Sequence, residues 1–201
     1  MDQNVLLEHV KWHLAQTDPA MLPYAEIVAS HAALRKLQAG EMFPPSKAGQ
    51  RQLIGIGDGV LRLFYVDEKQ KEVTVQLLTS GDLLIFTDAY QSIAPNRKYQ
   101  CQSLTPSRMV VWSHESLEYF NQNLPNWHHF SMKKSQQLLL KAAAERSEMF
   151  KDDATMRYLK FVEQHPTIID LIQLRHVADY LGIAPQSLSR IRQQIFQQGK
   201  K

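Results

Sequence analysis

The stretch that decides the fold runs from Leu174 to Arg192 and reads LRHVADYLGIAPQSLSRIR. Apolar residues recur in its first half at the spacing of one helix face, and Gly182 stands where that helix has to end in a left-handed turn. Pro185 follows at the position that proline favours at the start of a helix. The stretch therefore predicts two short helices joined by a glycine turn, a helix-turn-helix.

The second predicted helix has an apolar side and a polar side that lacks acidic residues. Leu188 and Ile191 lie on the apolar side, three residues apart. In a helix-turn-helix the second helix enters the major groove, where arginine pairs with guanine and glutamine with adenine, while serine reaches phosphates. We predict that double-stranded DNA is bound by six residues of this helix: Gln186, Ser187, Ser189, Arg190, Arg192 and Gln193.

The distribution of charge supports this assignment. Residues 1–120 contain 11 Lys and Arg against 13 Asp and Glu, whereas residues 121–201 contain 12 against 7. A polyanion is therefore expected to meet the C-terminal part. A plain helical hairpin with a basic tail remains the alternative, in a small-molecule-binding module whose tail does not bind DNA.

Several classes of protein are not expected from the composition. Cys101 is the single cysteine, so the chain can form neither an internal disulfide nor a cluster of thiolate ligands. Met1 to Val10 lacks the apolar core of a secretory signal, and no run approaches the roughly 18 apolar residues of a membrane-spanning helix. The strand-rich region 50–112 contains no histidine for a barrel-type metal centre. We therefore expect a cytoplasmic protein that is not an enzyme, without a metal site.

A long helix is expected upstream of the motif. Asn123-Leu124-Pro125 resembles a helix start, and the chain from there to about residue 150 contains no further glycine or proline. Pairs of apolar residues seven positions apart form two adjacent stripes along this helix, which predicts pairing with a second copy of the chain. The predicted homodimer interface consists of Met132, Leu139, Ala142 and Met149.

The first half of the chain mixes helices with strands. Residues 2–37 show helical spacing, with a break at Asp18-Pro19 and a second short helix from Tyr24 to His31. Short alternating runs follow Gly59, and the polar residues 67–70 predict a hairpin loop. We expect an α+β protein with an N-terminal β-roll, a double-layered arrangement similar to a jelly roll.

On these motifs the sequence resembles the Crp/Fnr family over nearly the whole chain. The resemblance rests on Gly81-Asp82-Leu83, on Asn123-Leu124-Pro125 and on the segment from Tyr180 to Arg190. It implies a β-roll effector domain related to cyclic-nucleotide-binding domains over residues 1–122, a dimerisation helix over 123–152 and a DNA-binding domain over 153–201. It also implies that Arg190 reads guanine, that Gln186 replaces a glutamate which reads the opposite strand, and that RNA polymerase is a partner.

The residues that would bind cyclic AMP depart from the family pattern. Phe86 stands in the place of the glutamate that accepts the ribose hydroxyl, and Ala142 and Ala143 replace two hydroxyl side chains near the adenine. Arg97 keeps the arginine position, with Lys98 beside it. A site built for polar groups loses affinity when its partners are missing. We expect an effector pocket at these five residues that does not bind cyclic AMP at the family's usual affinity, with an effector that is unknown or absent.

No cofactor is predicted, although the histidines leave haem open as an alternative. Its candidate ligands are His9, His13, His31, Cys101, His114, His128 and His129. Residues 167–173 are too few for the β-hairpin wing that the family carries in its DNA-binding domain. We expect Arg192, Lys200 and Lys201 to supply phosphate contacts in its place.

Overall fold

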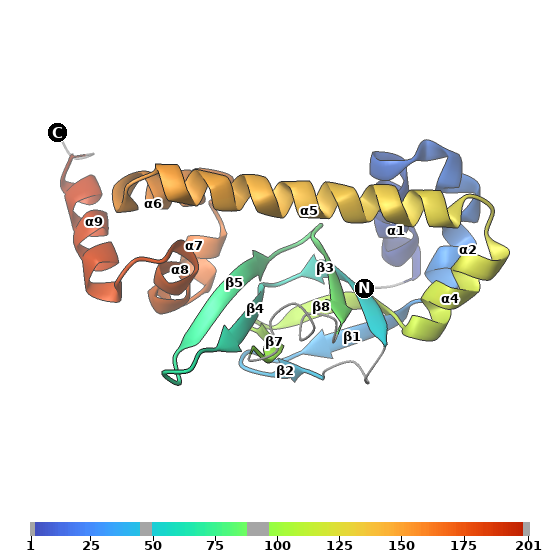
Figure 1. Ribbon diagram of the computed structural model, residues 1–201, viewed down its shortest axis with the longest axis horizontal. Coiled ribbons are helices and arrows are strands. Elements are labelled where there is room, and N and C mark those ends of the chain that lie inside the picture. The colour runs from blue at the N-terminus through green and yellow to red at the C-terminus, as the bar shows by residue number, and fades with distance from the viewer. Residues whose placement is uncertain (1–2, 45–49, 88–96, 199–201) are drawn as a thin grey trace.

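The computed structural model describes residues 3–44, 50–87 and 97–198 (Figure 1). The chain begins with the helices α1 (Gln3–Thr17), η1 (Pro19–Tyr24, a 3-10 helix) and α2 (Ala25–Ser30). The strands that follow are β1 (Ala33–Leu37), β2 (Met42–Phe43), β3 (Arg51–Asp58), β4 (Leu61–Val66), β5 (Glu72–Leu78), β6 (Leu83–Thr87), β7 (Tyr99–Ser103) and β8 (Ser107–Trp112). The C-terminal half contains α4 (His114–Asn123), α5 (Trp127–Lys151), α6 (Ala154–Gln164), α7 (Ile168–Leu171), α8 (Leu174–Leu181) and α9 (Pro185–Gln198).

The strands form two antiparallel sheets that face each other. Their strand orders are β1-β8-β3-β6 and β2-β7-β4-β5. Ile54 lies opposite Leu84 in one sheet, and Leu63 lies opposite Cys101 in the other. All four side chains are buried in the core between the sheets. The predicted α+β architecture, a β-roll followed by a long helix and a C-terminal helical unit, is confirmed.

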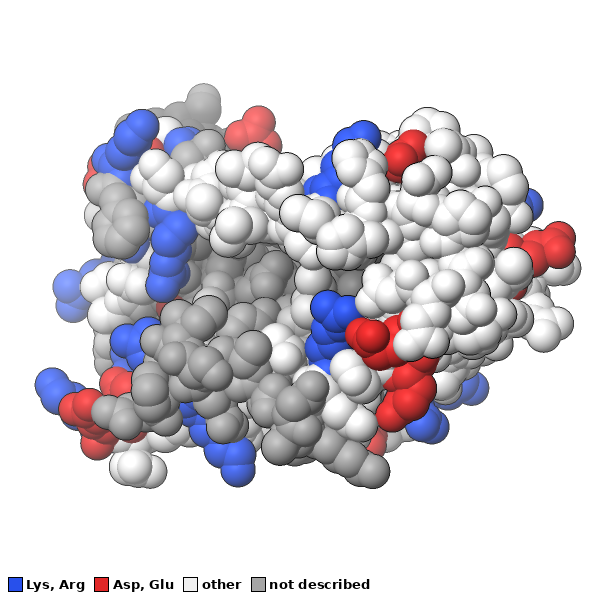
Figure 2. All heavy atoms as spheres, turned by 45° about the vertical axis from the view of Figure 1, so that its right-hand side comes forward, with Lys and Arg blue, Asp and Glu red and all other residues white. Residues whose placement is uncertain are grey.

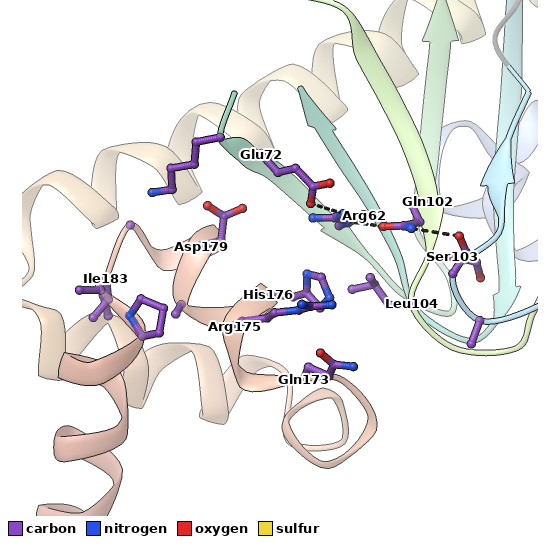
Figure 3. Close-up of a pocket in the computed structure, with 17 residues that line it drawn as sticks. Arg62, Glu72, Gln102, Ser103, Leu104, Gln173, Arg175, His176, Asp179 and Ile183 are labelled. Atoms are coloured by element: carbon purple, nitrogen blue, oxygen red, sulfur yellow. Dashed lines mark hydrogen bonds and ion pairs between the residues drawn. The ribbon is translucent and has the colours of Figure 1, made fainter. Parts of the chain in front are cut away.

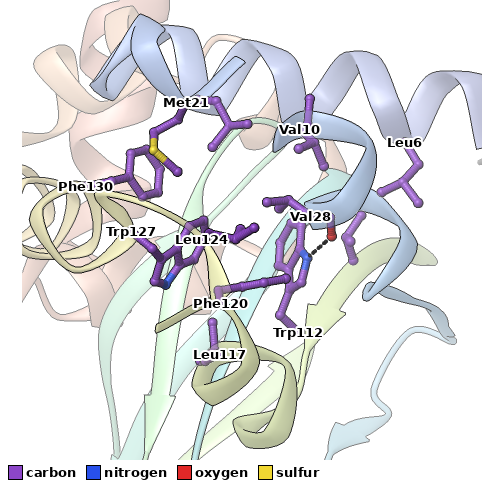
Figure 4. Close-up of a cluster of buried hydrophobic side chains, with 13 residues drawn as sticks. Leu6, Val10, Met21, Val28, Trp112, Leu117, Phe120, Leu124, Trp127 and Phe130 are labelled. Atoms are coloured by element: carbon purple, nitrogen blue, oxygen red, sulfur yellow. Dashed lines mark hydrogen bonds between the residues drawn. The ribbon is translucent and has the colours of Figure 1, made fainter. Parts of the chain in front are cut away.

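A second core joins the N-terminal helices to the first sheet and to α5 (Figure 4). Phe120 is fully buried at its centre, with its ring centroid 4.6 Å from that of Trp127. The Trp112 indole N–H donates a hydrogen bond to the Val28 carbonyl at 2.8 Å. Burial of large aromatic side chains supplies much of the free energy of folding. This cluster therefore fixes the first turns of α5 to the β-roll.

One strand lies where the sequence predicted a helix, and another lies outside the runs that predicted strands. Residues 33–37 continue the helical spacing of the N-terminal segment, yet they form β1, which pairs with β8 through Ala33 and Val111. β3 lies between Gly40 and Gly59, upstream of the alternating runs that predicted strands. Gly55 allows a close approach there, because a Cβ at this position would lie 3.1 Å from His9 Nε2.

The long helix α5 has 25 residues, about 37 Å at 1.5 Å per residue. It begins at Trp127, two residues after Pro125, because Asn123 still belongs to the separate helix α4. The predicted helix start at residue 123 is therefore wrong by four positions. At the other end the Asp153 side chain accepts the Met156 N–H at 2.8 Å and begins α6. None of the described helices is long and apolar enough to cross a membrane.

The end of the molecule formed by α1, α2 and α4 carries few charges (Figure 2). Between residues 17 and 34 the chain has only Asp18 and Glu26 as acidic or basic residues, apart from His31. The C-terminal helical unit lies at the opposite end of α5 (Figure 1). The five Lys and Arg residues of 171–201, against one acidic residue, therefore belong to the part of the chain at the far end of α5.

The buried histidine of α1 predicts that the folded protein loses stability in acid. His13 is 6% exposed, with its Nε2 atom 3.2 Å from that of His9. Burial, with the neighbouring His9 and Lys134, lowers the pKa of His13 from 6.5 to about 3, and Asp82 opposes this shift. Folding therefore favours neutral His13. Its stabilisation is complete above the unfolded pKa of 6.5 and is lost as the pH falls toward 3.

We expect the free energy of unfolding in urea to fall by about 2 kcal/mol from pH 7 to pH 5 on account of His13. His13→Gln should flatten this pH dependence, whereas His128→Gln, at an exposed position of α5, should leave it unchanged. An unaltered slope in His13→Gln would assign the acid sensitivity to another group.

Candidate nucleic-acid interface

The turn between α8 and α9 is set by one glycine. Gly182 has φ 63° and ψ 37°, the left-handed conformation that glycine adopts without steric cost. The Ile183 N–H donates to the Ala178 carbonyl at 2.8 Å and completes the helix end. The Arg157 guanidinium donates to the Leu181 carbonyl at 2.5 Å, so α6 holds the last turn of α8 in place. The predicted glycine turn is confirmed.

The helix α9 begins at Pro185, as predicted, and buries one side against α8 and α6. Leu188 is fully buried and Ile191 is 8% exposed. They belong to a core cluster with Val177 and Phe161. Because α8, α6 and α9 share this cluster, the orientation of α9 is fixed by its inner side.

The opposite side of α9 faces solvent. All six residues that the sequence assigned to DNA are exposed there: Gln186, Ser187, Ser189, Arg190, Arg192 and Gln193. Pro185 to Ile195 contains no acidic residue. The exposed side thus presents guanidinium, amide and hydroxyl groups, which can donate hydrogen bonds to phosphates and to base edges.

The segment before α8 contains a helix and no hairpin. Ile168–Leu171 form α7, so the stretch between α6 and α8 has no room for a β-hairpin wing. Among the residues expected to replace the wing, Arg192 is exposed on α9. Lys200 and Lys201 lie outside the described residues.

A hydrogen bond and apolar contacts fix the helical unit to the β-roll. The Asp179 carboxylate on α8 accepts the Thr74 backbone N–H of β5 at 2.6 Å. β5 is an edge strand, so this contact satisfies a donor that the sheet leaves unpaired. Val60 and Leu77 of the roll join the core cluster of the helical unit.

Beside this contact lies a cavity of about 980 Å³ between the two parts of the chain (Figure 3). Arg62 is buried in its wall and donates to Glu72 at 2.5 Å and to Gln102 at 2.8 Å. Burial, with Arg62 and Arg175 nearby, lowers the pKa of His176. The imidazole of His176 is therefore neutral near pH 7 and can both donate and accept a hydrogen bond.

The five residues proposed for an effector lie in different surroundings. Phe86 is 3% exposed and packs in the core of the roll, its ring centroid 6.0 Å from that of Phe43. The Arg97 guanidinium is exposed and lies 4.6 Å from the centre of the Tyr65 ring. Lys98 is exposed, as are Ala142 and Ala143 on α5. Phe86 thus adds an aromatic ring to the core where the family pattern places a carboxylate.

Three of the four predicted dimer residues are exposed on α5. Met132 is 61% exposed and Leu139 is 68% exposed, and Ala142 is also exposed. The side chain of Met149 lies outside the described residues. Leu140 is also 61% exposed beside Leu139, although it lies outside the seven-residue spacing of the predicted interface.

The structure groups few of the candidate metal and haem ligands. His9 and His13 are neighbours, while His31 stacks on Tyr119 with ring centroids 4.3 Å apart. Within residues 3–44, 50–87 and 97–198 no three His, Cys, Asp or Glu side chains are placed to hold a metal ion. Burial raises the pKa of the Cys101 thiol to about 12, so this cysteine stays protonated and unreactive.

Comparison with known proteins identifies the fold. No family model matches the sequence, and no curated protein matches it either.

Among solved structures, FixK2 from Bradyrhizobium japonicum is similar at a TM-score of 0.67 and 14% identity, over 84% of this chain and 86% of that one. A protein from Eubacterium rectale, assigned as a transcriptional regulator of the Crp/Fnr family, is similar at a TM-score of 0.66 and 11% identity, over 94% and 87%. The global regulator CLP of Xanthomonas campestris, described as responsive to c-di-GMP, has a TM-score of 0.58 and 16% identity, over 85% and 89%. The chain therefore has the fold of the Crp/Fnr family of transcription regulators.

Proposed function

We propose that this chain is a divergent Crp/Fnr-family transcription regulator that binds specific DNA sequences as a homodimer and catalyses no reaction. The observation that carries the proposal is the exposed side of α9, which presents arginine, glutamine and serine without a carboxylate on a helix fixed by Leu188 and Ile191. Negatively charged DNA approaches such a surface without electrostatic repulsion from the helix itself.

In the proposed complex, α9 lies in the major groove and each protomer reads one half-site. The exposed apolar residues Met132 and Leu139 of the 25-residue helix α5 pair with those of a second copy, which removes their side chains from water. A two-fold dimer reads a pseudo-palindrome whose half-sites are about 34 Å, or one helical turn, apart. Such a regulator works in the cytoplasm and meets RNA polymerase at promoters.

The β-roll would carry the regulatory input, if the protein responds to a small molecule. Phe86 in the core of the roll disfavours cyclic AMP, because an aromatic ring cannot accept a hydrogen bond from the ribose hydroxyl. An effector of other chemistry at Phe86, Arg97, Lys98, Ala142 and Ala143 remains part of the proposal, as does control by protein level alone.

Arg190→Ala is expected to weaken binding to the preferred site by about 1–3 kcal/mol in each half-site and to relax the preference at one base pair. The reason is the loss of two hydrogen bonds from the guanidinium to guanine. Binding should be measured by fluorescence anisotropy with the selected site and with single-base variants of it. Arg192→Ala serves as the control, since loss of a phosphate contact should weaken all sequences alike. An unchanged base preference in Arg190→Ala would show that another residue reads the guanine.

The second candidate function is a small-molecule-binding module without DNA binding, and the cavity of about 980 Å³ beside α8 favours it. Its size is in the range of ligand sites. Under this alternative the protein selects no sequence from random DNA, and its thermal stability is insensitive to any duplex.

A further inference from the structure

A second cavity, of about 470 Å³, lies against the first half of α5. Three of its wall residues, Leu117, Trp127 and Phe130, belong to the apolar cluster that joins α4 and α5 to the first sheet (Figure 4). Leu53, Ile85 and Leu138 complete its apolar wall. A volume of this size with a largely apolar wall is typical of sites for small organic ligands.

This cavity is separate from the residues that the sequence assigned to an effector. Phe86 packs in the core between the two sheets, with its ring centroid 6.0 Å from that of Phe43. Ile85 precedes Phe86 in β6, and consecutive side chains of a strand point to opposite faces of its sheet. Leu53 lies opposite Ile85 in the ladder and shares its face. The cavity therefore lies on the outer face of the first sheet, and none of the five assigned residues lines it.

A lysine of α5 gives this cavity a positive charge. Trp127, Ser131, Lys134 and Leu138 are spaced by four, three and four positions, so the cavity lies along one face of the helix. Lys134 is half-buried, and within the described residues its ammonium group makes no hydrogen bond or ion pair. Burial and the charge of Lys141 lower the pKa of this ammonium. Lys134 thus carries its charge in unfavourable surroundings.

The other charged groups near the cavity do not neutralise Lys134. Arg51 also lines the wall, and it is paired with Glu118 at 3.1 Å. Lys141 is paired with Asp82 at 2.9 Å. Among the described residues that line the cavity, none is acidic. An anionic group on a ligand would therefore complement the cavity where Lys134 enters it.

We propose that this cavity binds an apolar carboxylic acid, with the carboxylate at Lys134 and the hydrocarbon part against Leu117, Phe130 and Leu138. The carboxylate stabilises an ammonium that burial destabilises. The hydrocarbon part leaves water for an apolar wall, which also favours binding. Met132, a predicted dimer residue, lines the same cavity, so a bound acid would adjoin the surface that the proposed dimer uses.

The test is isothermal titration calorimetry of the full chain at pH 7 with decanoate, octanoate and decanol, below the concentrations at which they form micelles. We expect saturable binding with one decanoate per protomer. Octanoate is shorter by two methylene groups and should bind roughly tenfold more weakly. Decanol has the same chain without the charge, and it should also bind roughly tenfold more weakly.

Three variants separate the charge from the apolar wall. Lys134→Met keeps an unbranched side chain and removes the ammonium, so it should weaken decanoate binding roughly tenfold and leave decanol binding unchanged. Lys133→Met is the matched control, because Lys133 is exposed beside Lys134 and does not line the cavity. It should bind both ligands as wild type does. Ser135→Phe, at an exposed position of the wall, should fill the cavity and abolish binding of both ligands.

Each result supports or overturns the proposal. Equal affinity of wild type and Lys134→Met for decanoate would overturn the role of Lys134. Absence of saturable decanoate binding to wild type, or undiminished binding to Ser135→Phe, would overturn the site itself. These titrations contain no DNA, so their outcome does not depend on whether α9 reads a specific sequence.

Discussion

Leu139→Lys is expected to convert the dimer into monomers and to lower affinity for the two-half-site operator by roughly 10²- to 10⁴-fold. Leu139 is 68% exposed at the middle of α5, and the dimer proposed here buries it against its copy. A lysine there places two ammonium groups together in an apolar seam. In a monomer the two recognition helices are no longer linked. Binding of one helix to its half-site therefore no longer raises the effective concentration of the other helix at the second half-site. Analytical ultracentrifugation and operator binding should be measured on the same preparation.

Leu34→Lys is the matched control for this substitution. Leu34 is 43% exposed on β1, away from α5, and the same change of side chain there should alter neither mass nor affinity. If Leu139→Lys sediments as wild type does, the self-association surface lies elsewhere on the molecule.

Phe120→Ala is expected to lower the free energy of unfolding by about 3–5 kcal/mol. Phe120 is fully buried in the cluster that joins α4, the first sheet and α5, with Trp127 in contact. Removing the ring loses its burial and leaves a cavity that the surrounding helices cannot close. Urea unfolding at pH 7 and at one fixed protein concentration measures the effect, since dimer stability depends on concentration.

Tyr119, the neighbour of Phe120 in sequence, provides a control for the loss of unfolding free energy in Phe120→Ala. Tyr119 is 40% exposed and stacks on His31, so Tyr119→Ala should cost about 1 kcal/mol or less. Similar losses for the two variants would mean that the aromatic cluster does not dominate the stability of this end of the molecule.

The helical half of the fold was predictable because its signals are local. Gly182 at the end of one apolar pattern and Pro185 at the start of the next mark a turn that only a few residues can form, and both have the predicted roles in the structure. The length of α5 likewise follows from a long run without glycine or proline. The helix start at residue 123 was wrong because Asn123 and Pro125 also suit the connection between α4 and α5.

The strands that were missed depend on contacts distant in sequence. β1 has four exposed residues and one buried residue, so it lacks the alternation that indicates a strand, and its pairing with β8 decides its structure. β3 has glycines at 55 and 57, which normally suggest turns. Gly55 instead packs closely against the His9 ring, a contact between α1 and β3 that no local pattern encodes.

The candidate site also has a part that local sequence signals predict and a part that depends on contacts distant in sequence. The polar side of α9 follows from helix periodicity, so all six assigned residues are exposed together. The surroundings of Phe86 and Arg97 could not be predicted, since they depend on Phe43 and Tyr65 from other strands. The hydrogen bond from Thr74 to Asp179 likewise joins residues 105 positions apart.

The central claim is that α9 of a dimer reads a specific DNA sequence, and selection from a random duplex library at two salt concentrations tests it most directly. The account predicts enrichment of a two-fold-symmetric site whose half-sites are centred one helical turn apart, bound more weakly as salt rises because phosphate contacts release counterions. Binding without sequence preference, or none at low salt, would contradict it.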